Sequence, residues 1–240
     1  MQVVLLAAGL GSRLGELTRQ LPKALIGVAG ESLLGRAVGF ARRLAPDEII
    51  VVGGFGLAEV EAEIARARLA VTLIENPSFR DGNLLSLLAA RARIAGDFVV
   101  MNVDHIYGPA IANLVAPEVG EVTAFIDHDR ALGADDMKVA RDPAGRVRAI
   151  AKTLSSFDCG YVGMTRVPRE ALDRYWRAAD TVTAEEGRGA HVERVLARLA
   201  ASDRPPACRD ISGVGWLEVD VPEERAHAER VIRLAPGSWR

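Results

Sequence analysis

Residues 3–14 read VVLLAAGLGSRL, an apolar run that passes directly into a glycine-rich turn. The run Val3–Leu6 is unbroken rather than alternating, which is typical of a parallel strand buried on both faces. It lacks the basic region that begins a signal peptide, so we interpret it as the first buried strand of the fold. Gly9 and Gly11 lack side chains that would keep phosphate oxygens away from the backbone N–H groups of the turn. The stretch therefore predicts a strand followed by a phosphate-binding turn.

Four further apolar runs have strand length and the same nearly unbroken pattern: Glu48–Val52, Val71–Ile74, Phe98–Val103 and Val122–Ile126. Between them, apolar residues recur at helical spacing in three segments, which run from Leu33 to Leu44, from Leu57 to Ala67 and from Leu84 to Ala92. Strands that alternate with helices indicate βαβ units. The predicted fold class is α/β, with a Rossmann-like, mostly parallel sheet flanked by helices.

The pattern changes after residue 130. Two short segments, Met137–Arg141 and Arg146–Lys152, flank the sequence Asp142-Pro143-Ala144-Gly145, which suits a type I turn and predicts a hairpin. The expected order continues with a strand at Cys159–Met164, a helix opened by Pro168, a helix carrying His191–Leu199, a strand at Trp216–Val219 and a terminal helix from Pro222. We expect one domain, 1–240, with a core of residues 1–130 and 207–240 and an antiparallel lobe of residues 131–206.

The composition excludes several classes of protein. The 240 residues carry 30 Lys and Arg against 32 Asp and Glu, and a formal net charge of −2 gives no general attraction to nucleic acid. No apolar run approaches the roughly 18 residues that a membrane helix needs, so no membrane insertion is expected. The two cysteines, Cys159 and Cys208, form no CxxC pair, which argues against a disulfide framework and a structural zinc and fits a cytoplasmic location.

Two other kinds of nucleotide-binding turn are alternative interpretations of the first loop. A dinucleotide-binding GxGxxG turn would have a third glycine where this chain has Leu14, and a P-loop would need a GK[ST] sequence at the required spacing. Downstream, Lys23 stands in the segment PKAL, so Arg13 and Lys23 can supply two cations for a triphosphate. The remaining alternative is a tight turn with a solvated Arg13.

Two aspartates follow predicted strands. Asp104 comes directly after Phe98–Val103, and Asp220 comes directly after Trp216–Val219. In open α/β sheets the carboxyl ends of the strands form the ligand crevice, and carboxylates that reach it can hold Mg²⁺. We expect Asp104 and Asp220 to bind Mg²⁺, although each is also placed to favour the start of a following helix.

The sequence LAAGLGSRL followed by PKAL resembles the signature of nucleotidyltransferases that join a nucleoside triphosphate to a sugar phosphate or alcohol phosphate. Three further segments, VDHIY at 103–107, DDMKV around Lys138 and FDCGYVGM around Cys159, are most similar to CTP:inositol-1-phosphate cytidylyltransferases. The resemblance covers nearly the whole chain and implies that Asp104 and Asp220 bind Mg²⁺. The Gly-Tyr pair after Cys159 departs from the family pattern, and its effect on acceptor choice stays open.

The resemblance also implies a nucleotide site and an acceptor site, the latter in the lobe of residues 131–206. The catalytic residues would be Arg13 and Lys23. The nucleotide-binding residues would be Leu6, Ala8, Gly9, Gly11, Ser12, Arg13, Lys23, Gly53, Asn83, Ser86 and Asp104. The acceptor phosphate would be held by Lys138 and Lys152, and acceptor hydroxyls suit the carboxylates of Asp135, Asp136 and Asp158. Asn83 also suits a helix N-cap. We expect His105 to support the site rather than act as a base, because an acceptor phosphate is already a nucleophile at neutral pH.

We therefore expect an Mg²⁺-dependent transfer of CMP from CTP to an alcohol or polyol phosphate such as inositol 1-phosphate, with release of pyrophosphate. The alternatives are a guanylyl, uridylyl or thymidylyl transferase acting on a sugar 1-phosphate, a choline phosphate or phosphonate cytidylyltransferase, and a nucleotide-binding regulatory module without turnover. The expected partners are an NTP and a phosphate-bearing alcohol or sugar, and a homodimer is left open. Because the chain ends soon after its predicted terminal helix, we expect no fused membrane-embedded transferase.

Overall fold

Four of the predicted apolar runs form the parallel part of one sheet in the computed structural model, which describes residues 1–19, 21–115 and 120–239. In spatial order these strands are β6 (Phe98–Asn102), β1 (Gln2–Leu6), β4 (Glu48–Gly53) and β5 (Thr72–Glu75). They are parallel, and Leu6 lies between Asn102 and Val52 in register. The predicted Rossmann-like arrangement is confirmed, and the loops after β1 and β6 leave the sheet at the same edge.

The fifth run does not join the parallel set, which corrects the prediction for Val122–Ile126. It forms β8 (Thr123–Asp127), which pairs antiparallel with β11 (Cys159–Val167) and parallel with β12 (Ala207–Asp210). β11 also runs antiparallel to β6, so it connects the parallel strands to the rest of the sheet. A strand buried on both faces has the same apolar pattern whichever way its neighbour runs, so this pattern carries no information on direction.

The predicted hairpin is present as β9 (Lys138–Arg141) and β10 (Val147–Ala151). The backbone carbonyl of Asp142 accepts a hydrogen bond from Gly145 N at 2.9 Å, and its carboxylate accepts one from Arg146 N at 2.9 Å. Both contacts close the Asp-Pro-Ala-Gly turn that the sequence predicted.

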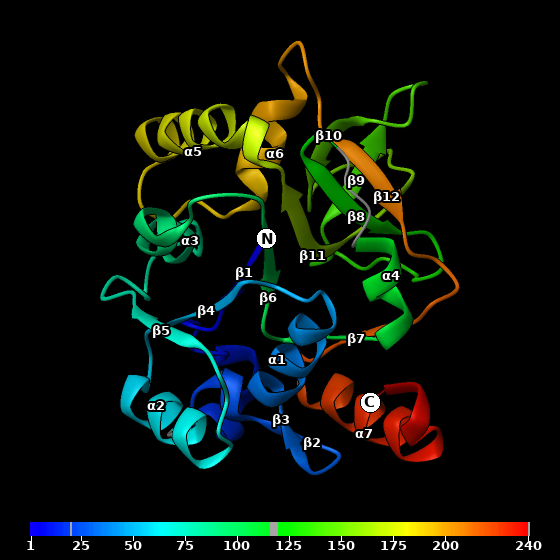
Figure 1. The fold of residues 1–240 in the computed structure, drawn as a ribbon. Coiled ribbons are helices and arrows are strands. Elements are labelled where there is room, and N and C mark those ends of the chain that lie inside the picture. The colour runs from blue at the N-terminus through cyan, green and yellow to red at the C-terminus, as the bar shows by residue number, and fades with distance from the viewer. Residues whose placement is uncertain (20, 116–119, 240) are drawn as a thin grey trace.

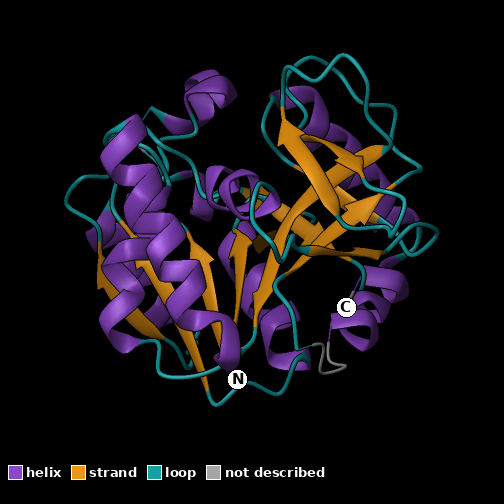
Figure 2. Cartoon of the chain, turned by 90° about the horizontal axis from the view of Figure 1, so that it is seen from above, coloured by secondary structure: helices purple, strands orange, loops and turns teal. Residues whose placement is uncertain are grey.

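Helices cover both faces of the sheet (Figures 1 and 2). They are α1 (Leu33–Arg43), α2 (Leu57–Arg66), α3 (Leu84–Ala90), α4 (Ala112–Val115), α5 (Leu172–Glu186), α6 (Glu193–Ala200) and α7 (Pro222–Leu234). Within β1, Val4 and Leu6 belong to the core beneath α3, α5 and α6, whereas Val3 and Leu5 belong to the core beneath α1. Successive strand side chains point to opposite faces, so helices on both sides account for the unbroken apolar run.

The predicted last strand lies outside the main sheet. Two short antiparallel ribbons are present: β7 (His105–Tyr107) with β13 (Trp216–Glu218), and β2 (Gly27–Val28) with β3 (Glu31–Ser32). No sequence pattern predicted β7. Beyond β13, α7 packs against the first loop in a small third core that contains Leu14, Val219 and Ile232. The C-terminal segment is thereby brought beside the first loop of the chain.

Within the described residues, one sheet of nine strands runs through both predicted parts of the chain. The division into a core and a lobe within residues 1–240 stays a prediction, and its residues 20, 116–119 and 240 lie outside those that the structure describes. None of the helices in the described ranges is long and apolar enough to cross a membrane.

Candidate active site

A cavity of about 320 Å³ opens where β1 and β6 end and β11 begins. One wall is formed by the first loop and the start of α3: Leu6, Ala8, Gly9, Gly11, Ser12, Arg13, Lys23, Asn83 and Ser86. The centre is lined by Asn102, Val103, Asp104, His105, Trp216, Glu218 and Asp220. The other wall is formed by Leu132, Asp135, Asp136, Met137, Lys152, Tyr161, Gly163, His191 and Glu193. The size and the mixed lining are typical of a site for a small molecule.

The first loop is shaped by Gly11, whose φ of 66° lies in the left-handed region. A Cβ at this position would sit 2.8 Å from the Cβ of Lys23. The Gly11 carbonyl accepts hydrogen bonds from Leu14 N at 2.9 Å and from the hydroxyl of Thr18 at 2.8 Å. Leu14, at the position of the third glycine in a dinucleotide-binding turn, is buried. The close approach at Gly11 places Arg13 and Lys23 on one wall of the cavity.

Lys23 lies between the two predicted metal ligands. Its Nζ donates hydrogen bonds to Oδ2 of Asp104 at 2.6 Å and to Oδ1 of Asp220. Arg13 pairs with the other oxygen of Asp220 at 2.6 Å. Burial opposes the charge of Lys23, but the two aspartates outweigh it and raise the pKa of Lys23. Burial also opposes ionisation of Asp104, but Lys23 and His105 hold its pKa far below the usual range.

Asp104 and Asp220 form a donor set that fits Mg²⁺. One oxygen of each converges on the same ammonium group, so both carboxylates face a common point. Mg²⁺ is often held by one or two carboxylates together with substrate phosphates and water. In the described part of the chain, no group of three or more His, Cys, Asp or Glu side chains is arranged to hold a metal. A metal held by this pair would therefore take its remaining ligands from substrate and water.

His105 is buried in contact with Asp104. Its Nδ1 lies 2.6 Å from Oδ1 of Asp104, and its ring stacks on Trp216 with centroids 5.2 Å apart. A Cβ at Gly163 would sit 2.8 Å from Nε2 of His105, so this glycine makes room for the ring. Burial lowers the pKa of His105, but Asp104 and Glu218 outweigh it and raise that pKa. These contacts support the expectation that His105 holds Asp104 in place.

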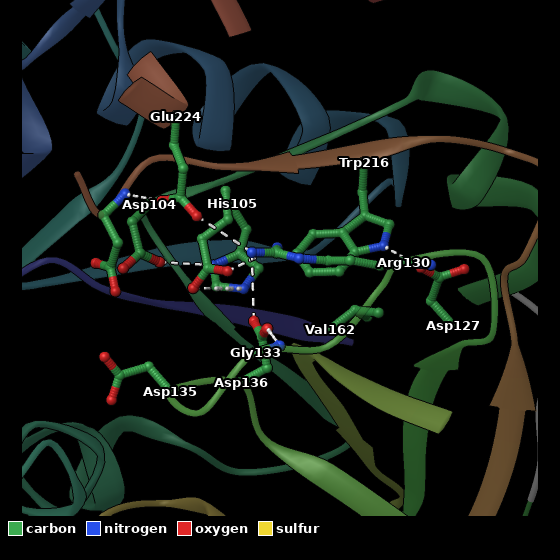
Figure 3. Close-up of polar contacts among 12 residues, drawn as sticks. Asp104, His105, Asp127, Arg130, Gly133, Asp135, Asp136, Val162, Trp216 and Glu224 are labelled. Atoms are coloured by element: carbon green, nitrogen blue, oxygen red, sulfur yellow. Dashed lines mark hydrogen bonds and ion pairs between the residues drawn. The ribbon is translucent and has the colours of Figure 1, made fainter. Parts of the chain in front are cut away.

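Arg130 joins the loop before β9 to the segment that carries Asp220 (Figure 3). Its guanidinium nitrogens lie 2.7 Å from Glu218 and 3.2 Å from Glu224. One of them also lies 3.3 Å from Asp136. Glu224 in turn accepts a hydrogen bond from the backbone N of Asp220 at 2.7 Å. One side chain thus connects a predicted acceptor residue, Asp136, to a predicted metal ligand.

Asn83 and Ser86 line the cavity at the start of α3, and both have protein partners. Asn83 occupies the N-cap position without a capping bond, and its Oδ1 instead accepts a hydrogen bond from Val192 N at 2.9 Å. Asn83 is thus at the predicted N-cap position, but its side chain bonds to the start of α6 and not to its own helix. The hydroxyl of Ser86 accepts a hydrogen bond from Asn76 at 2.9 Å. Gly53, predicted to bind nucleotide, is not among the lining residues, because it ends β4 and its carbonyl is bonded to Asn76 N.

Lys138 does not line the cavity, and its contact with an acceptor phosphate stays a prediction. Its Nζ donates to the carbonyl oxygens of Gly133 at 2.6 Å, of Lys152 at 2.8 Å and of Asp136 at 3.4 Å. An ammonium group has three donors, and these contacts use all of them. Lys138 therefore orders the loop before β9, and a lysine at a strand start has the same appearance in sequence whether it binds a ligand or main-chain carbonyls.

The other predicted acceptor residues divide into two groups. Asp158 lies outside the lining, because its carboxylate accepts a hydrogen bond from the backbone N of Arg141 at 2.6 Å. Lys152, Asp135 and Asp136 all line the cavity. Lys152 is 44% exposed and lies 3.9 Å from Asp135, so its amine is available to an anion.

Residues 3–167 match the model of the MobA-like NTP transferase domain. The chain belongs to this family. It is a nucleotidyltransferase domain, in agreement with the resemblance carried by the first loop and the PKAL segment.

Relatives of this nucleotidyltransferase domain include a "Bifunctional IPC transferase and DIPP synthase" of Rubrobacter xylanophilus, 34% identical over 230 residues that cover 95% of the chain and 51% of the relative. A "CMP-5'-(3-aminopropyl)phosphonate synthase" of Streptomyces rubellomurinus is 30% identical over 254 residues, which cover 98% of the chain and 39% of the relative. The chain thus spans about half the length, or less, of these curated relatives. The inositol-1-phosphate CTP transferase from T. maritima shares the fold, with a TM-score of 0.81 at 14% identity over 96% of both chains.

Some cavity residues of the nucleotidyltransferase domain have no sequence pattern that predicts them. His191 and Glu193 line the cavity just before and at the start of α6. Arg130 lies outside the lining and contacts Glu218 of the cavity from the loop before β9. Glu224 does carry a signal, because a glutamate in the first turn of a helix opened by Pro222 commonly accepts hydrogen bonds from the N-terminal amides. Its contact with the segment that carries Asp220 could have been predicted.

We expect Arg130→Met to lower kcat and to lower the free energy of unfolding by about 1–3 kcal/mol. The variant leaves Glu218, Glu224 and Asp136 without their shared cation, and it removes a guanidinium that lies 5.0 Å over the Trp216 ring. The side chains of the ion pairs are 18–29% exposed, so the loss is smaller than for a fully buried pair. Pyrophosphate release at saturating substrates and urea unfolding measure the two effects.

Arg91→Met is the matched control for this variant. Arg91 pairs with Asp180 at 2.7 Å and lies 5.2 Å over the Trp176 ring, but it does not line the cavity. The Arg91→Met variant should therefore leave kcat unchanged. An Arg130→Met enzyme with the kcat of wild type would show that Arg130 has no part in ordering the site.

Proposed function

We propose that this nucleotidyltransferase domain transfers CMP from CTP to the phosphate of a polyol such as inositol 1-phosphate, in an Mg²⁺-dependent reaction that releases pyrophosphate. The observation that carries the proposal is the meeting of Arg13, Lys23, Asp104 and Asp220 in the lining of a cavity that also contains Lys152. The printed names of relatives that handle CTP or form CMP conjugates support the choice of cytidine.

The first loop would bind the triphosphate. Backbone N–H groups near Gly9 and Gly11 and the cations of Arg13 and Lys23 suit its oxygens. In the free protein Lys23 and Arg13 neutralise Asp104 and Asp220. When bound by the two aspartates, Mg²⁺ would supply the positive charge that nucleotidyl transfer needs. Lys23 would then be free to turn from the carboxylates to the phosphates.

The acceptor phosphate would attack the α-phosphorus in line. A bond forms between an acceptor phosphate oxygen and the α-phosphorus, while the bond from that phosphorus to the oxygen of the β-phosphate breaks and pyrophosphate leaves. The phosphate oxygen already carries the negative charge of a nucleophile, so no protein base is required. Lys152 would orient this phosphate, and Asp136 and Asp135 lie in the same wall for contacts with hydroxyls. Rate acceleration would come from orientation and charge stabilisation.

A matrix of ATP, CTP, GTP and UTP against phosphorylated acceptors tests the proposal. The acceptors are inositol 1-phosphate, glucose 1-phosphate, N-acetylglucosamine 1-phosphate, phosphocholine and 3-aminopropylphosphonate, and the readout is pyrophosphate release with Mg²⁺. We expect CTP with inositol 1-phosphate to give the highest kcat/KM, by at least about tenfold, which corresponds to about 1.4 kcal/mol of differential transition-state binding.

Other outcomes of the matrix identify the alternatives. Preference for a sugar 1-phosphate with GTP or UTP would replace the proposal with a sugar nucleotidyltransferase. Preference for phosphocholine or the phosphonate would retain CTP and change the acceptor. Nucleotide binding without pyrophosphate release from any pair would favour a regulatory module.

A further inference from the structure

Glu193 is a buried carboxylate in the wall of the cavity. It is the first residue of α6, and it is 8% exposed. Burial raises its pKa, and the dipole of its own backbone amide opposes that increase. Among the residues that the structure describes, no other group donates a hydrogen bond to this side chain, and none forms an ion pair with it. The carboxylate therefore faces the cavity without a protein partner of its own.

The other carboxylates of the cavity differ from Glu193 in this respect. Each has at least one ion pair with an arginine or lysine: Asp104, Asp135, Asp136, Glu218 and Asp220. A negative charge near a helix N-terminus is favourable and accounts for a glutamate at the start of α6. It does not account for burial of that glutamate at a cavity wall, since a buried charge is costly unless a partner compensates it. A ligand that donates hydrogen bonds would supply the compensation.

The backbone around Glu193 is held firmly in place. Val192 N donates to Oδ1 of Asn83 at 2.9 Å, Leu84 N donates to the carbonyl of Ala190 at 3.2 Å, and Gly82 N donates to that of Arg188 at 2.8 Å. A Cβ at Gly82 would lie 1.9 Å from the Ala190 oxygen, so the two segments approach as closely as a glycine allows. These contacts fix the start of α6 against the start of α3.

Besides its link to the start of α3, Glu193 lies near the residues proposed to bind the acceptor. α6 packs on β10, and Lys152 follows directly after β10. Burial raises the pKa of Glu193, and the charges of His191 and Lys152 oppose this increase. Tyr161, in the same wall, already shares a hydrogen bond with Thr165 at 2.7 Å. Glu193 is thus a free acceptor beside the lysine proposed to hold the acceptor phosphate.

We propose that Glu193 is a specificity-determining residue that accepts hydrogen bonds from hydroxyl groups of the polyol while Lys152 holds its phosphate. This inference rests on the proposed function. Ionised carboxylates are acceptors with about four lone-pair sites, which suits neighbouring hydroxyls on one ring. The cationic side chain of Lys152 disfavours an acceptor with an ammonium group in the same place. A ring that carries hydroxyl groups and no charge of its own is compatible with the carboxylate of Glu193 and with the ammonium of Lys152.

The test compares inositol 1-phosphate with cyclohexyl phosphate, which has the same ring size and phosphate but no other hydroxyl. We expect Glu193→Gln to lower kcat/KM for inositol 1-phosphate roughly 10- to 100-fold, mainly through KM, because a hydrogen bond to a charged group is lost. The KM for CTP should stay within about twofold. The inhibition constant of cyclohexyl phosphate against inositol 1-phosphate should also stay within about twofold, because this ligand has no hydroxyl for Glu193 to bind.

Two further variants separate ligand binding from helix stability. Glu193→Asp keeps a negative charge at the start of α6 but withdraws the carboxylate by one methylene, and we expect it to retain the thermal stability of wild type while losing acceptor affinity. Glu185→Gln is the matched control, since Glu185 is an exposed residue of α5 that pairs with Arg198 outside the cavity. It should have the kinetics of wild type. Full kcat/KM in Glu193→Asp would point to a charge effect on the helix and overturn the inference.

The remaining outcomes distinguish failure of the inference from failure of the proposed function. If wild type uses inositol 1-phosphate and Glu193→Gln uses it equally well, the inference alone is wrong. The inference alone is also wrong if Glu193→Gln raises the inhibition constant of cyclohexyl phosphate by the same factor by which it lowers kcat/KM for inositol 1-phosphate. If wild type uses phosphocholine and not inositol 1-phosphate, the proposed function is wrong. A loss of phosphocholine use in Glu193→Gln would then show an ammonium contact and overturn the hydroxyl contact as well.

Discussion

Asp104→Asn should lower kcat by about 100- to 10,000-fold at saturating CTP and Mg²⁺. Asparagine keeps the shape of the side chain but removes the negative charge that Lys23 and His105 contact at 2.6 Å each. An amide oxygen is a much weaker ligand for Mg²⁺ than a carboxylate, so the charge that offsets the triphosphate would be misplaced. Steady-state pyrophosphate release over a range of Mg²⁺ concentrations measures the effect.

The fold should survive this change. Lys23 keeps its contact with Asp220, so we expect a cooperative thermal transition that is lowered by several degrees. Asp180→Asn is the matched control, because Asp180 pairs with Arg91 on the surface of α5 and does not line the cavity. Pyrophosphate release at the wild-type rate by Asp104→Asn would contradict the proposal that Asp104 binds Mg²⁺.

Lys23→Met should destabilise the free protein by about 3–5 kcal/mol and abolish most turnover. The ammonium of Lys23 is the shared partner of Asp104 and Asp220, and its side chain is 9% exposed. Methionine fills the space of the aliphatic stem but leaves two carboxylates converging on a point without a cation. Urea unfolding of the free protein and steady-state kinetics measure the two losses.

Mg²⁺ provides a second readout for this variant. With Lys23 gone, a divalent ion can take its place between the carboxylates, so the rise in Tm on adding Mg²⁺ should be larger in Lys23→Met than in wild type. Lys152→Met serves as the control for stability, because Lys152 is 44% exposed and should change the free energy of unfolding by less than about 0.5 kcal/mol. Unchanged stability in Lys23→Met would contradict the role of Lys23 as the cation that neutralises the pair.

Prediction from the sequence succeeded where the deciding contacts are local. The strand at Gln2–Leu6 and the turn at Asp142–Gly145 depend on burial pattern and on residues a few positions apart. It did not foresee that the ammonium of Lys138 contacts carbonyls of the loop before β9 and of Lys152, 14 residues along the chain. It also failed for the direction of β8, because antiparallel pairing with β11 leaves no mark on the apolar pattern of either strand.

The sequence by itself determined the glycine-rich turn at the candidate site and the α/β class of the fold. A glycine at position 11 can adopt a φ of 66°, and this freedom belongs to the residue and not to its surroundings. Only the tertiary structure decided which charged side chains form ion pairs with one another. Lys23 contacts Asp220 across 197 positions of the chain, and Arg130 contacts Glu218 across 88. The reason is that such contacts depend on the pairing of β13 with β7 and the packing of α7 against the first loop, neither of which follows from the local spacing of residue types.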